Sequence, residues 1–353
     1  MMRAKAVHFS AVMAFCLVFL LTLPAFAANA PKAKAAPAKK AKIVWRVATV
    51  VPGGMGWSKR AKEILLPYID RFTEGELDVK IFWGGIKGDD DAILKQVKKG
   101  ELEGGGFSGY GTMAACREFS VLSLPFLFKS YDEVDFIRKS MYSEFDQYVE
   151  KRGLRLILWV DQDFDQLYSM KHDLSSLAKI RASRFVRWYG DIEKHLFATL
   201  GVSSTPASIT DINRIVGRGE VDAAIAPAMW VLGSQIFPFV KCILPVKVRY
   251  SPVTVMVSKK VWNESPEKYR QGYIKERESI TREFTDYSRK DSERCMRAMI
   301  AYGIVEAKMD PREEAQLQAI AKTVWKRAAG DLYPQSLLDE VIAKLEQFRK
   351  AKG

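Results

Sequence analysis

Histidine is scarce in this chain, and its scarcity excludes several kinds of catalytic site. Only His8, His172 and His195 occur among the 353 residues. A zinc site built from several histidines would therefore lack ligands. Neither His172 nor His195 accompanies a serine or cysteine in a recognisable nucleophile turn, so a Ser-His-Asp arrangement is not predicted. This scarcity weakens any prediction of an enzyme with such a site, and it agrees with a protein that binds and releases a ligand without chemistry.

Cysteines are few and widely spaced. The chain contains Cys16, Cys116, Cys242 and Cys295, and no C-x-x-C pair. Because closely spaced pairs are the usual signature of a zinc site, none is predicted. Cys16 lies in an N-terminal apolar run, which leaves three cysteines in the rest of the chain. One disulfide and three unpaired cysteines are both compatible with that odd number.

Phosphate-binding motifs are absent or incomplete. The chain has no G-x-x-x-x-G-K-[ST] sequence, and the G-x-G-x-x-G match at residues 104–109 follows the end of a predicted helix. A dinucleotide fingerprint instead requires a strand before its first glycine. We therefore interpret these glycines as a tight strand that another backbone approaches closely. No cofactor is predicted.

The acidic triplet Asp89-Asp90-Asp91 resembles a calcium-binding cluster only loosely. Aspartate is a preferred N-cap residue, and an amphipathic helical segment follows at residues 92–99. We therefore predict a solvated helix N-cap at this position and no metal site.

Long apolar runs are confined to the amino terminus. Arg3 and Lys5 precede an apolar stretch from Ala11 to Leu23, and Ala25 and Ala27 then form an A-x-A-like cleavage site. This is the three-part pattern of a secretory signal peptide. The run is shorter than the ~20 residues that a spanning helix needs. Residues 1–27 are therefore predicted to be a cleaved signal peptide, and the mature chain is predicted to be periplasmic.

The formal net charge of +13 invites a nucleic-acid interpretation, but much of that charge lies near the amino terminus. Residues 28–42 (ANAPKAKAAPAKKAK) contain five lysines and no apolar periodicity. Such a composition is typical of a disordered basic linker. Together with Arg3 and Lys5, this linker leaves a folded body of only about +6. Nucleic-acid binding is therefore not predicted.

From residue 42 onward, strand-like and helix-like segments alternate, which indicates an α/β fold. Strands are predicted at residues 42–51, 77–82, 104–108, 154–160, 184–186, 221–226 and 253–257. Helices are predicted at residues 57–72, 90–99, 192–200, 210–217, about 265–303, 311–328 and 335–350. The apolar stripe of the long, charged helix comprises Tyr269, Tyr273, Ile280, Phe284, Tyr287, Cys295 and Met299.

Arginines are concentrated around one predicted strand. Arg181, Arg184 and Arg187 recur every third residue there, and Arg214 and Arg218 follow. Two interpretations remain open for each of the first three. One is ordinary solvent-exposed charge, and the other is a guanidinium that binds a ligand carboxylate in bidentate geometry.

Five passages, in order, resemble the periplasmic solute-binding proteins of tripartite ATP-independent periplasmic (TRAP) transporters, the dicarboxylate-receptor or DctP-like type. They span residues 45–345, and the two strongest are LPFLF at Leu124–Phe128 and GEVDAA at Gly219–Ala224. The other similar passages are VATVVPGGMGWSKRAKEILLPYIDRFTEGELDVKIFWGG, GDDDAILKQVKKGELEGGGFSGYG and YSPVTVMVSKKVWNESPEKYR.

The resemblance implies a type II periplasmic-binding-protein-like fold, with two α/β lobes around a ligand cleft and a long hinge-crossing helix. Lobe I would comprise residues 43–165 plus about 256–353, which includes the hinge and C-terminal helices, and lobe II residues 166–255. The implied function is capture of an organic acid by a monomer, whose closed form docks on the permease subunits of a TRAP transporter in the membrane. The alternatives are an exported receptor of the same fold with a more apolar ligand, for sensing or envelope traffic, and, third, an exported hydrolase.

The family's carboxylate-binding arginine aligns near Val186, so Arg187 is our first candidate, followed by Arg184 and Arg181. The sequence departs from the family at two places: Ile225 and Ala226 replace a Glu-Asn pair, and residues 161–165 (DQDFD) replace a segment that often carries a second arginine. These departures favour a monocarboxylate with a larger apolar or aromatic body. Side chains that could line its cleft, or simply pack in the core, are Trp188, Tyr189, Met229, Trp230, Phe164 and Tyr110, with Ala226 beside them.

Overall fold

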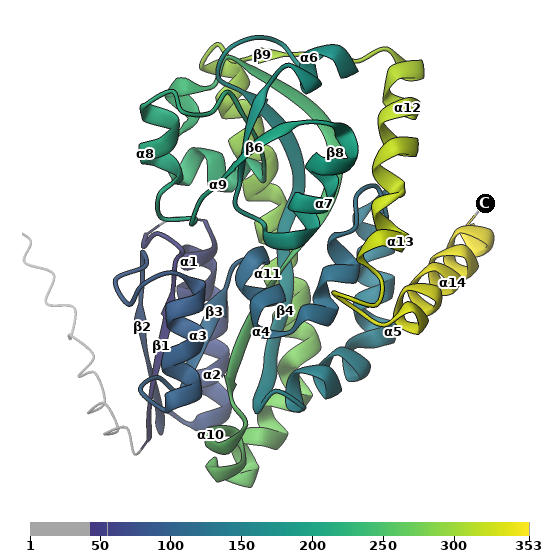
Figure 1. Cartoon of the computed structure of the whole chain (residues 1–353). Coiled ribbons are helices and arrows are strands. Elements are labelled where there is room, and N and C mark those ends of the chain that lie inside the picture. Colours follow the sequence, from purple (N-terminus) through teal and green to yellow (C-terminus); the bar gives the residue numbers. More distant parts are fainter. Residues whose placement is uncertain (1–42, 55, 353) are drawn as a thin grey trace, which may run out of the picture. The chain divides into compact units, whose positions relative to one another are not determined.

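A computed structural model describes residues 43–54 and 56–352, which lie within one compact unit (Figure 1). The predicted signal peptide and linker, residues 1–42, lie outside the described residues. In the described part, one mixed sheet of nine strands forms the centre of the fold. Its strands are β1 (Ile43–Thr49), β2 (Leu77–Phe82), β3 (Gly104–Phe107), β4 (Leu154–Ser169), β5 (Arg184–Arg187), β6 (Ser203–Pro206), β7 (Ala223–Ala226), β8 (Cys242–Ser258) and β9 (Val305–Glu306).

The sheet has the strand order β2-β1-β3-β8-β4-β7-β5-β6, with β9 paired to β8. The long antiparallel strands β4 and β8 join two groups of shorter strands. β3 pairs with the end of β8, at residues 254–257, whereas β7 pairs with the end of β4, at residues 166–169. Both long strands therefore run from one group of short strands to the other.

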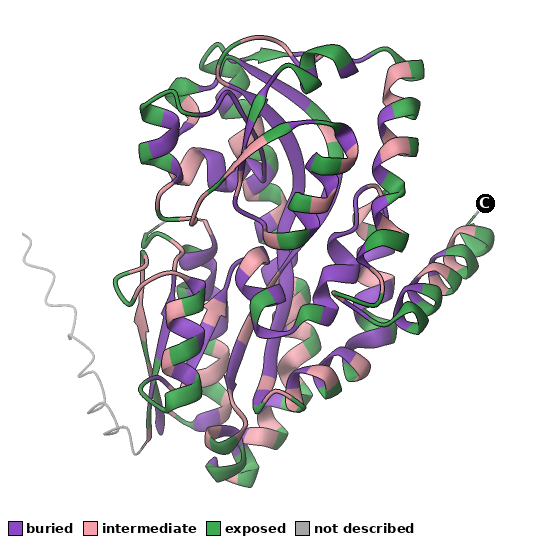
Figure 2. Cartoon of the chain, in the orientation of Figure 1, coloured by how far each residue is buried: buried purple, intermediate pink, exposed green. Residues whose placement is uncertain are grey.

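The long strand β4 is buried because its first half is mostly apolar and the charged residues of its second half have partners inside the protein. All residues of β4 except Arg155 are buried, and Figure 2 shows the same burial along the centre of the sheet. The pairing of β4 with β8 shifts register at three places: between Leu156 and Leu158, between Asp161 and Asp163, and between Asp165 and Leu167. Such irregularities bend a strand and redirect its side chains, and the last two lie where β4 passes from one strand group to the other.

Helices cover the sheet on both faces (Figure 1). The first half of the chain contributes α1 (Trp57–Arg60), the π-helical turn η1 (Ala61–Leu65), α2 (Leu66–Thr73), α3 (Asp90–Lys99), α4 (Gly109–Ala115), the 3-10 turn η2 (Arg117–Ser123), α5 (Tyr131–Glu150) and α6 (Leu177–Arg181). The second half contributes α7 (Gly190–Leu200), α8 (Ile212–Gly217), α9 (Ala228–Gly233), the 3-10 turn η3 (Phe237–Phe239), α10 (Lys259–Glu264), α11 (Glu267–Ala301), α12 (Pro311–Lys322), α13 (Val324–Ala328) and α14 (Gln335–Lys352).

The predicted long helix is α11, which has 35 residues. It packs against α2, which lies between β1 and β2 in the chain, and against α9, which follows β7, so it contacts helices from both strand groups. Its predicted stripe is confirmed at five buried residues, namely Tyr269, Tyr273, Ile280, Phe284 and Met299. Tyr287 was wrongly assigned to that stripe, because it is 42% exposed and its ring lies 4.8 Å from the guanidinium carbon of Arg60. Small buried polar residues, such as Ser288, take part of the inner face instead.

One local prediction was confirmed and another was wrong in detail. The strand predicted at residues 184–186 is β5, and Arg181 lies before it, at the end of the short helix α6 that Ser176 caps. The aspartate triplet is not simply solvated: Asp89 caps α3 through the amide of Ala92, at 3.0 Å, but Asp90 is fully buried.

Two further features of the described residues concern cysteines and the membrane. Cys116, Cys242 and Cys295 are all free, which decides between the two alternatives that the sequence left open. No helix among the described residues is long and apolar enough to cross a bilayer.

Candidate functional site

Two cavities lie on either side of a stacked tryptophan pair. The rings of Trp188 and Trp230 stack at 5.1 Å with 13° between their planes. Trp188 lines a cavity of about 390 Å³, called here the Arg187 cavity, and Trp230 lines one of about 340 Å³, called here the Met229 cavity. The Arg187 cavity is formed by Asp89, Asp90, Asp91, Tyr110, Arg187, Trp188, Gly190, Pro206, Ala207, Ser208 and Ile209.

Among the described residues, Arg187 is the one cation that lines the Arg187 cavity. It ends β5, and its backbone carbonyl accepts a hydrogen bond from Ala207 at 2.9 Å. The side chain is half-buried, and among the described residues its guanidinium has no hydrogen-bond or ion-pair partner. A guanidinium in this state offers its full fork of donors to an anion.

None of the three aspartates in the lining forms an ion pair with Arg187 in the described chain, and their oxygens accept hydrogen bonds from uncharged donors instead. Asp90 accepts hydrogen bonds from the amide of Ser108, at 3.1 Å, and from its hydroxyl, at 2.6 Å. Asp91 accepts a hydrogen bond from the Tyr110 hydroxyl at 2.7 Å. Burial raises the pKa of Asp90 to about 6, although the Ser108 hydrogen bonds act in the opposite direction.

A buried carboxylate holds the tryptophan side of the cavity in place. The amides of Trp188 and Tyr189 both donate to one oxygen of Glu193, at 2.8 and 2.9 Å, at the start of α7. The indole nitrogen of Trp188 donates to the carbonyl of Ile225 on β7, at 2.9 Å. Trp188 is therefore fixed at both its backbone and its ring, and it forms a rigid wall.

Behind this wall lies a fully buried ion-pair cluster that the sequence did not predict. Arg249 on β8 binds Asp165 at 2.7 Å and Glu193 at 2.9 Å, and none of the three side chains is exposed. The guanidinium carbon also lies 3.8 Å from the centre of the Tyr189 ring. Burial raises the pKa of Asp165 to about 6, opposed by Arg249 and by a hydrogen bond from Ser251. The available signal was an arginine in the segment CILPVKVRYS, which is the first part of β8.

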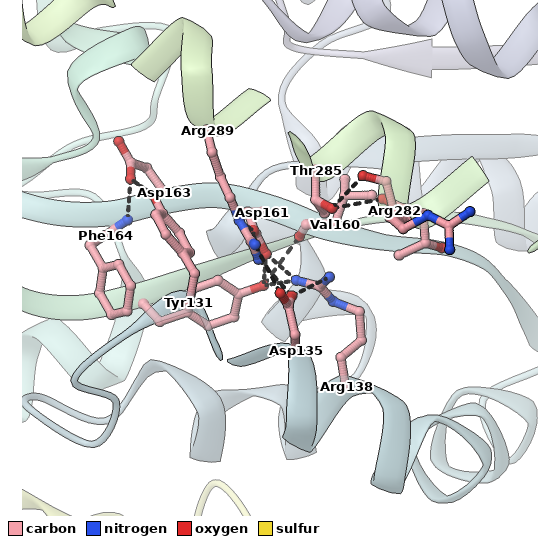
Figure 3. A network of polar contacts seen from close by, with 12 residues as sticks. Tyr131, Asp135, Arg138, Val160, Asp161, Asp163, Phe164, Arg282, Thr285 and Arg289 are labelled. Carbon is pink, nitrogen blue, oxygen red and sulfur yellow. Dashed lines mark hydrogen bonds and ion pairs between the residues drawn. The ribbon is translucent and has the colours of Figure 1, made fainter. Parts of the chain in front are cut away.

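A second buried network surrounds the register shift of β4 (Figure 3). Asp161 accepts hydrogen bonds from Arg138 on α5, from Arg289 on α11 at 2.7 Å, and from the Tyr250 hydroxyl at 2.7 Å. Asp135 binds Arg289 at 2.6 Å. The DQDFD segment therefore serves mainly to connect β4 to its neighbours, and Asp161 draws α5 and α11 together.

Asp163 also belongs to that segment. It accepts a hydrogen bond from the Tyr131 hydroxyl, and burial raises its pKa to about 6, an effect that this hydrogen bond opposes. With Asp161 and Asp165 bound as described, each aspartate of the segment has a partner inside the protein.

The Met229 cavity differs in its electrostatics. Its cations all have carboxylate partners: Lys59 lies 3.7 Å from Glu63, while Arg60 and Arg294 lie 2.7 and 3.4 Å from Asp291. Its apolar lining comprises Val51, Pro52, Trp57, Met229, Trp230 and Leu232. This cavity therefore suits an uncharged, apolar group better than a carboxylate.

The remaining predicted residues are placed away from both cavities. Arg184 binds Asp222 at 2.9 Å, and Arg181 donates to the carbonyl of Leu200 at 3.0 Å. Tyr189, Phe164 and Ala226 are each at most 1% exposed and pack in the core. Of the predicted residues, the structure thus brings Arg187, Trp188 and Tyr110 to one cavity, and Met229 and Trp230 to the other.

The described residues contain no cluster of three His, Cys, Asp or Glu side chains that could hold a metal ion. Cys295 lines the Met229 cavity, but burial raises the pKa of its thiol to about 11, which disfavours the reactive thiolate.

Comparison with solved structures identifies the fold. It is similar to a TRAP periplasmic solute-binding protein from Desulfovibrio salexigens with bound orotic acid, at 16% identity, with a TM-score of 0.80 over 86% of this chain and 99% of that one. A TRAP solute-binding protein from Chromohalobacter salexigens with bound D-glucuronate is similar at 19% identity, with a TM-score of 0.78 over 85% of this chain and 99% of that one. The fold is therefore the predicted type II periplasmic-binding fold.

Sequence comparison gives the family. A solute-binding protein from Chromohalobacter salexigens is 22% identical over 66% of this chain and 68% of its own length. An uncharacterised Haemophilus influenzae protein is 22% identical over 56% of this chain and 60% of its own length, so the match spans about three fifths of that relative. The family model described as bacterial extracellular solute-binding protein, family 7, matches residues 48–331, most of the chain. The chain therefore belongs to this family of solute-binding proteins, in agreement with the resemblance found in its motifs.

Proposed function

We propose that this protein captures a small organic acid and delivers it to a TRAP-type permease in the membrane. The observation that carries the proposal is Arg187, a half-buried guanidinium that lines a cavity without a carboxylate partner among the described residues. Because a charge-assisted hydrogen bond contributes about 1.5–3 kcal/mol, one such arginine can select for a carboxylate.

The proposed ligand is a monocarboxylate with an apolar or aromatic body. Its carboxylate would bind Arg187, and its body would lie against Trp188, a wall fixed by the Ile225 carbonyl. The cavity also contains Asp89 and Asp91, which would repel a second carboxylate placed near them. This arrangement favours one negative charge on the ligand over two.

Two lobes would close on this ligand. We assign residues 43–165 plus about 256–353 to lobe I and residues 166–255 to lobe II. The assignment is supported by the way β4 and β8 change strand partners along their length. It is also supported by the close approach of Gly56 to Met229, since a Cβ added to that glycine would lie 2.6 Å from the Met229 sulfur.

Export would precede ligand capture. The amino-terminal pattern supports cleavage after Ala27 and a periplasmic mature chain. The family consists of extracellular solute-binding proteins rather than enzymes, which also supports this location.

The proposal is tested by a thermal-shift screen of mono- and dicarboxylates on the mature chain. An acid that binds the folded state raises Tm by mass action. We expect aromatic or branched monocarboxylates to raise Tm more than C4-dicarboxylates at equal concentration. If uncharged apolar compounds raise Tm and no acid does, the protein is instead a receptor for an apolar ligand. The observation that favours this alternative is the apolar lining of the Met229 cavity.

A further inference from the structure

A third cavity lies between α5 and α11. It has a volume of about 430 Å³ and is called here the α5–α11 groove. It shares no lining residue with the Arg187 cavity. Its lining is strongly polar and consists of Asp135, Arg138, Lys139, Tyr142, Arg277, Glu278, Thr281, Arg282, Thr285 and Asp286.

Two arginines of this groove have no carboxylate partner among the described residues. The guanidinium carbon of Arg277 lies 3.9 Å from the centre of the Tyr142 ring, so the aromatic face holds it in place. Arg282, about one turn further along α11, is exposed and has no ion-pair partner in the described chain. Both guanidinium groups are thus available to an anion.

One buried donor of the groove, the Nε of Arg138, has no hydrogen-bond acceptor among the described residues. Arg138 is 6% exposed, and its terminal nitrogens bind Asp135, at 3.1 Å, and Asp161. Its Nε is buried, and no partner for it exists among the described residues. A buried donor without an acceptor costs about 1–3 kcal/mol. An acceptor that entered the groove from solvent would remove part of this cost.

The carboxylates of the groove do not compensate for these cations. Asp135 is bound to both Arg138 and Arg289, and Glu278 lies 3.6 Å from Lys139. Asp286 remains, an exposed residue with no ion pair to Arg282. Apart from these ion pairs, the lining carries two positive charges, on Arg277 and Arg282, and one negative charge, on Asp286.

We propose that the α5–α11 groove is a second anion site, which binds a small multivalent oxyanion such as a phosphate or a polycarboxylate. Arg277 and Arg282 bind its oxygens, and the Thr281 hydroxyl provides a further donor at the same surface. With the unpartnered Nε of Arg138 on α5 as a further donor, the bound anion links α11 to α5 beside the Asp161 network that Figure 3 shows. This proposal does not depend on ligand capture at Arg187.

Inorganic phosphate is a suitable probe, used with the mature chain in isothermal titration calorimetry at constant ionic strength. We expect saturable phosphate binding that chloride at the same ionic strength does not reproduce. Arg277→Ala and Arg282→Ala should each weaken binding about tenfold, because each removes a charge-assisted contact. Asp286→Asn should strengthen binding, because it removes the one unpaired negative charge of the groove.

The controls separate this site from others. Lys260→Ala removes an exposed cation of α10 that lies 3.9 Å from Glu264 and does not line the groove, so it should bind phosphate as the wild type does. Arg187→Ala should also bind phosphate as the wild type does, whereas its affinity for the organic acid should fall.

The proposal is overturned if phosphate does not bind, if Arg282→Ala and Lys260→Ala bind phosphate equally well, or if Arg187→Ala abolishes phosphate binding. Tm in chloride verifies that each variant is folded, and the exposed Arg282 carries the test if Arg277→Ala does not fold.

Discussion

At the scale of single residues, the arginines of this protein differ in whether a carboxylate already neutralises them. Arg184 and Arg187 stand three residues apart on β5, yet Arg184 binds Asp222 and Arg187 binds no carboxylate in the described chain. Arg249, fully buried, binds two carboxylates. The same residue type therefore occurs here in three different states, which are a surface ion pair, a guanidinium without an ion pair that we propose binds the ligand, and a buried ion-pair cluster.

Replacement of the buried arginine tests its supporting role. Arg249→Met should lower the free energy of unfolding at pH 7 by about 3–5 kcal/mol, because Asp165 and Glu193 would remain buried without a counter-charge. Arg184→Met is the control, since it breaks a half-exposed pair with Asp222 and should cost much less. Urea denaturation of both variants measures the difference. Equal losses would contradict the supporting role of Arg249.

The pKa of Asp90 predicts a pH effect. Burial raises it to about 6 in the folded state, against about 3.9 in the unfolded chain, so the folded state binds the additional proton between about pH 6 and pH 4. The contribution of this residue to stability therefore rises as the pH falls through that window. The free energy of unfolding of the wild type, relative to Asp90→Asn, should increase by up to about 3 kcal/mol from pH 7 to pH 4. Urea denaturation at several pH values measures it, and a pH-independent difference would refute it.

The sequence predicted some of these residue roles and not others. Arg187 could be proposed because it follows a predicted strand and lies next to the position of a family arginine, and Trp188 because it is an aromatic residue beside it. Glu193 and Arg249 could not be connected, since they are 56 residues apart and come together only when β8 pairs with β4 and α7 packs nearby. The same reason explains why Asp90 was predicted to be solvated: its partner, Ser108, is 18 residues away.

At the scale of elements, apolar periodicity located most helices and strands but underestimated the two longest strands. Residues 154–160 and 253–257 were predicted, whereas β4 extends to Ser169 and β8 begins at Cys242. The missed part of β4 contains the DQDFD segment, whose charges resemble those of a loop. Buried partners such as Arg138 and Arg249 neutralise these charges, and their positions depend on tertiary packing.

The glycines of β3 were correctly predicted to allow close backbone approach. A Cβ added to Gly104 would lie 2.7 Å from the carbonyl oxygen of Met256 on the neighbouring strand. Gly104→Ala should therefore reduce the free energy of unfolding by about 1–3 kcal/mol. Gly233→Ala is the matched control, because no atom lies within 4 Å of the added Cβ and its stability should be unchanged or slightly higher. Thermal denaturation of both variants tests the claim, which fails if Gly104→Ala is as stable as Gly233→Ala.

At the scale of the whole molecule, the resemblance predicted more than the residue pattern alone. Alternating strands and helices indicated an α/β fold, but the order of the nine-stranded sheet could not follow from that alternation. Sheet order depends on contacts between distant segments, such as β3 with β8, that local sequence does not encode. The motifs were needed to select the type II fold, with which the solved structures agree.

The export of the whole molecule is also testable. We expect the mature chain to begin at Ala28, because the small residues Ala25 and Ala27 form the cleavage site. Expression of the full chain in a Gram-negative host, followed by intact-mass measurement of the periplasmic fraction, determines the new terminus. Recovery of the uncleaved chain, held at the membrane by its apolar run, would contradict this expectation.

The central claim is that Arg187 captures the carboxylate of the ligand. Isothermal titration calorimetry of the best acid from the screen tests this most directly, with Arg187→Ala compared to Arg181→Ala, an exposed arginine outside the cavity. We predict that Arg187→Ala weakens binding about 10- to 100-fold, because it removes a charge-assisted contact. Arg181→Ala should bind as the wild type does. Unchanged affinity in folded Arg187→Ala would contradict the account.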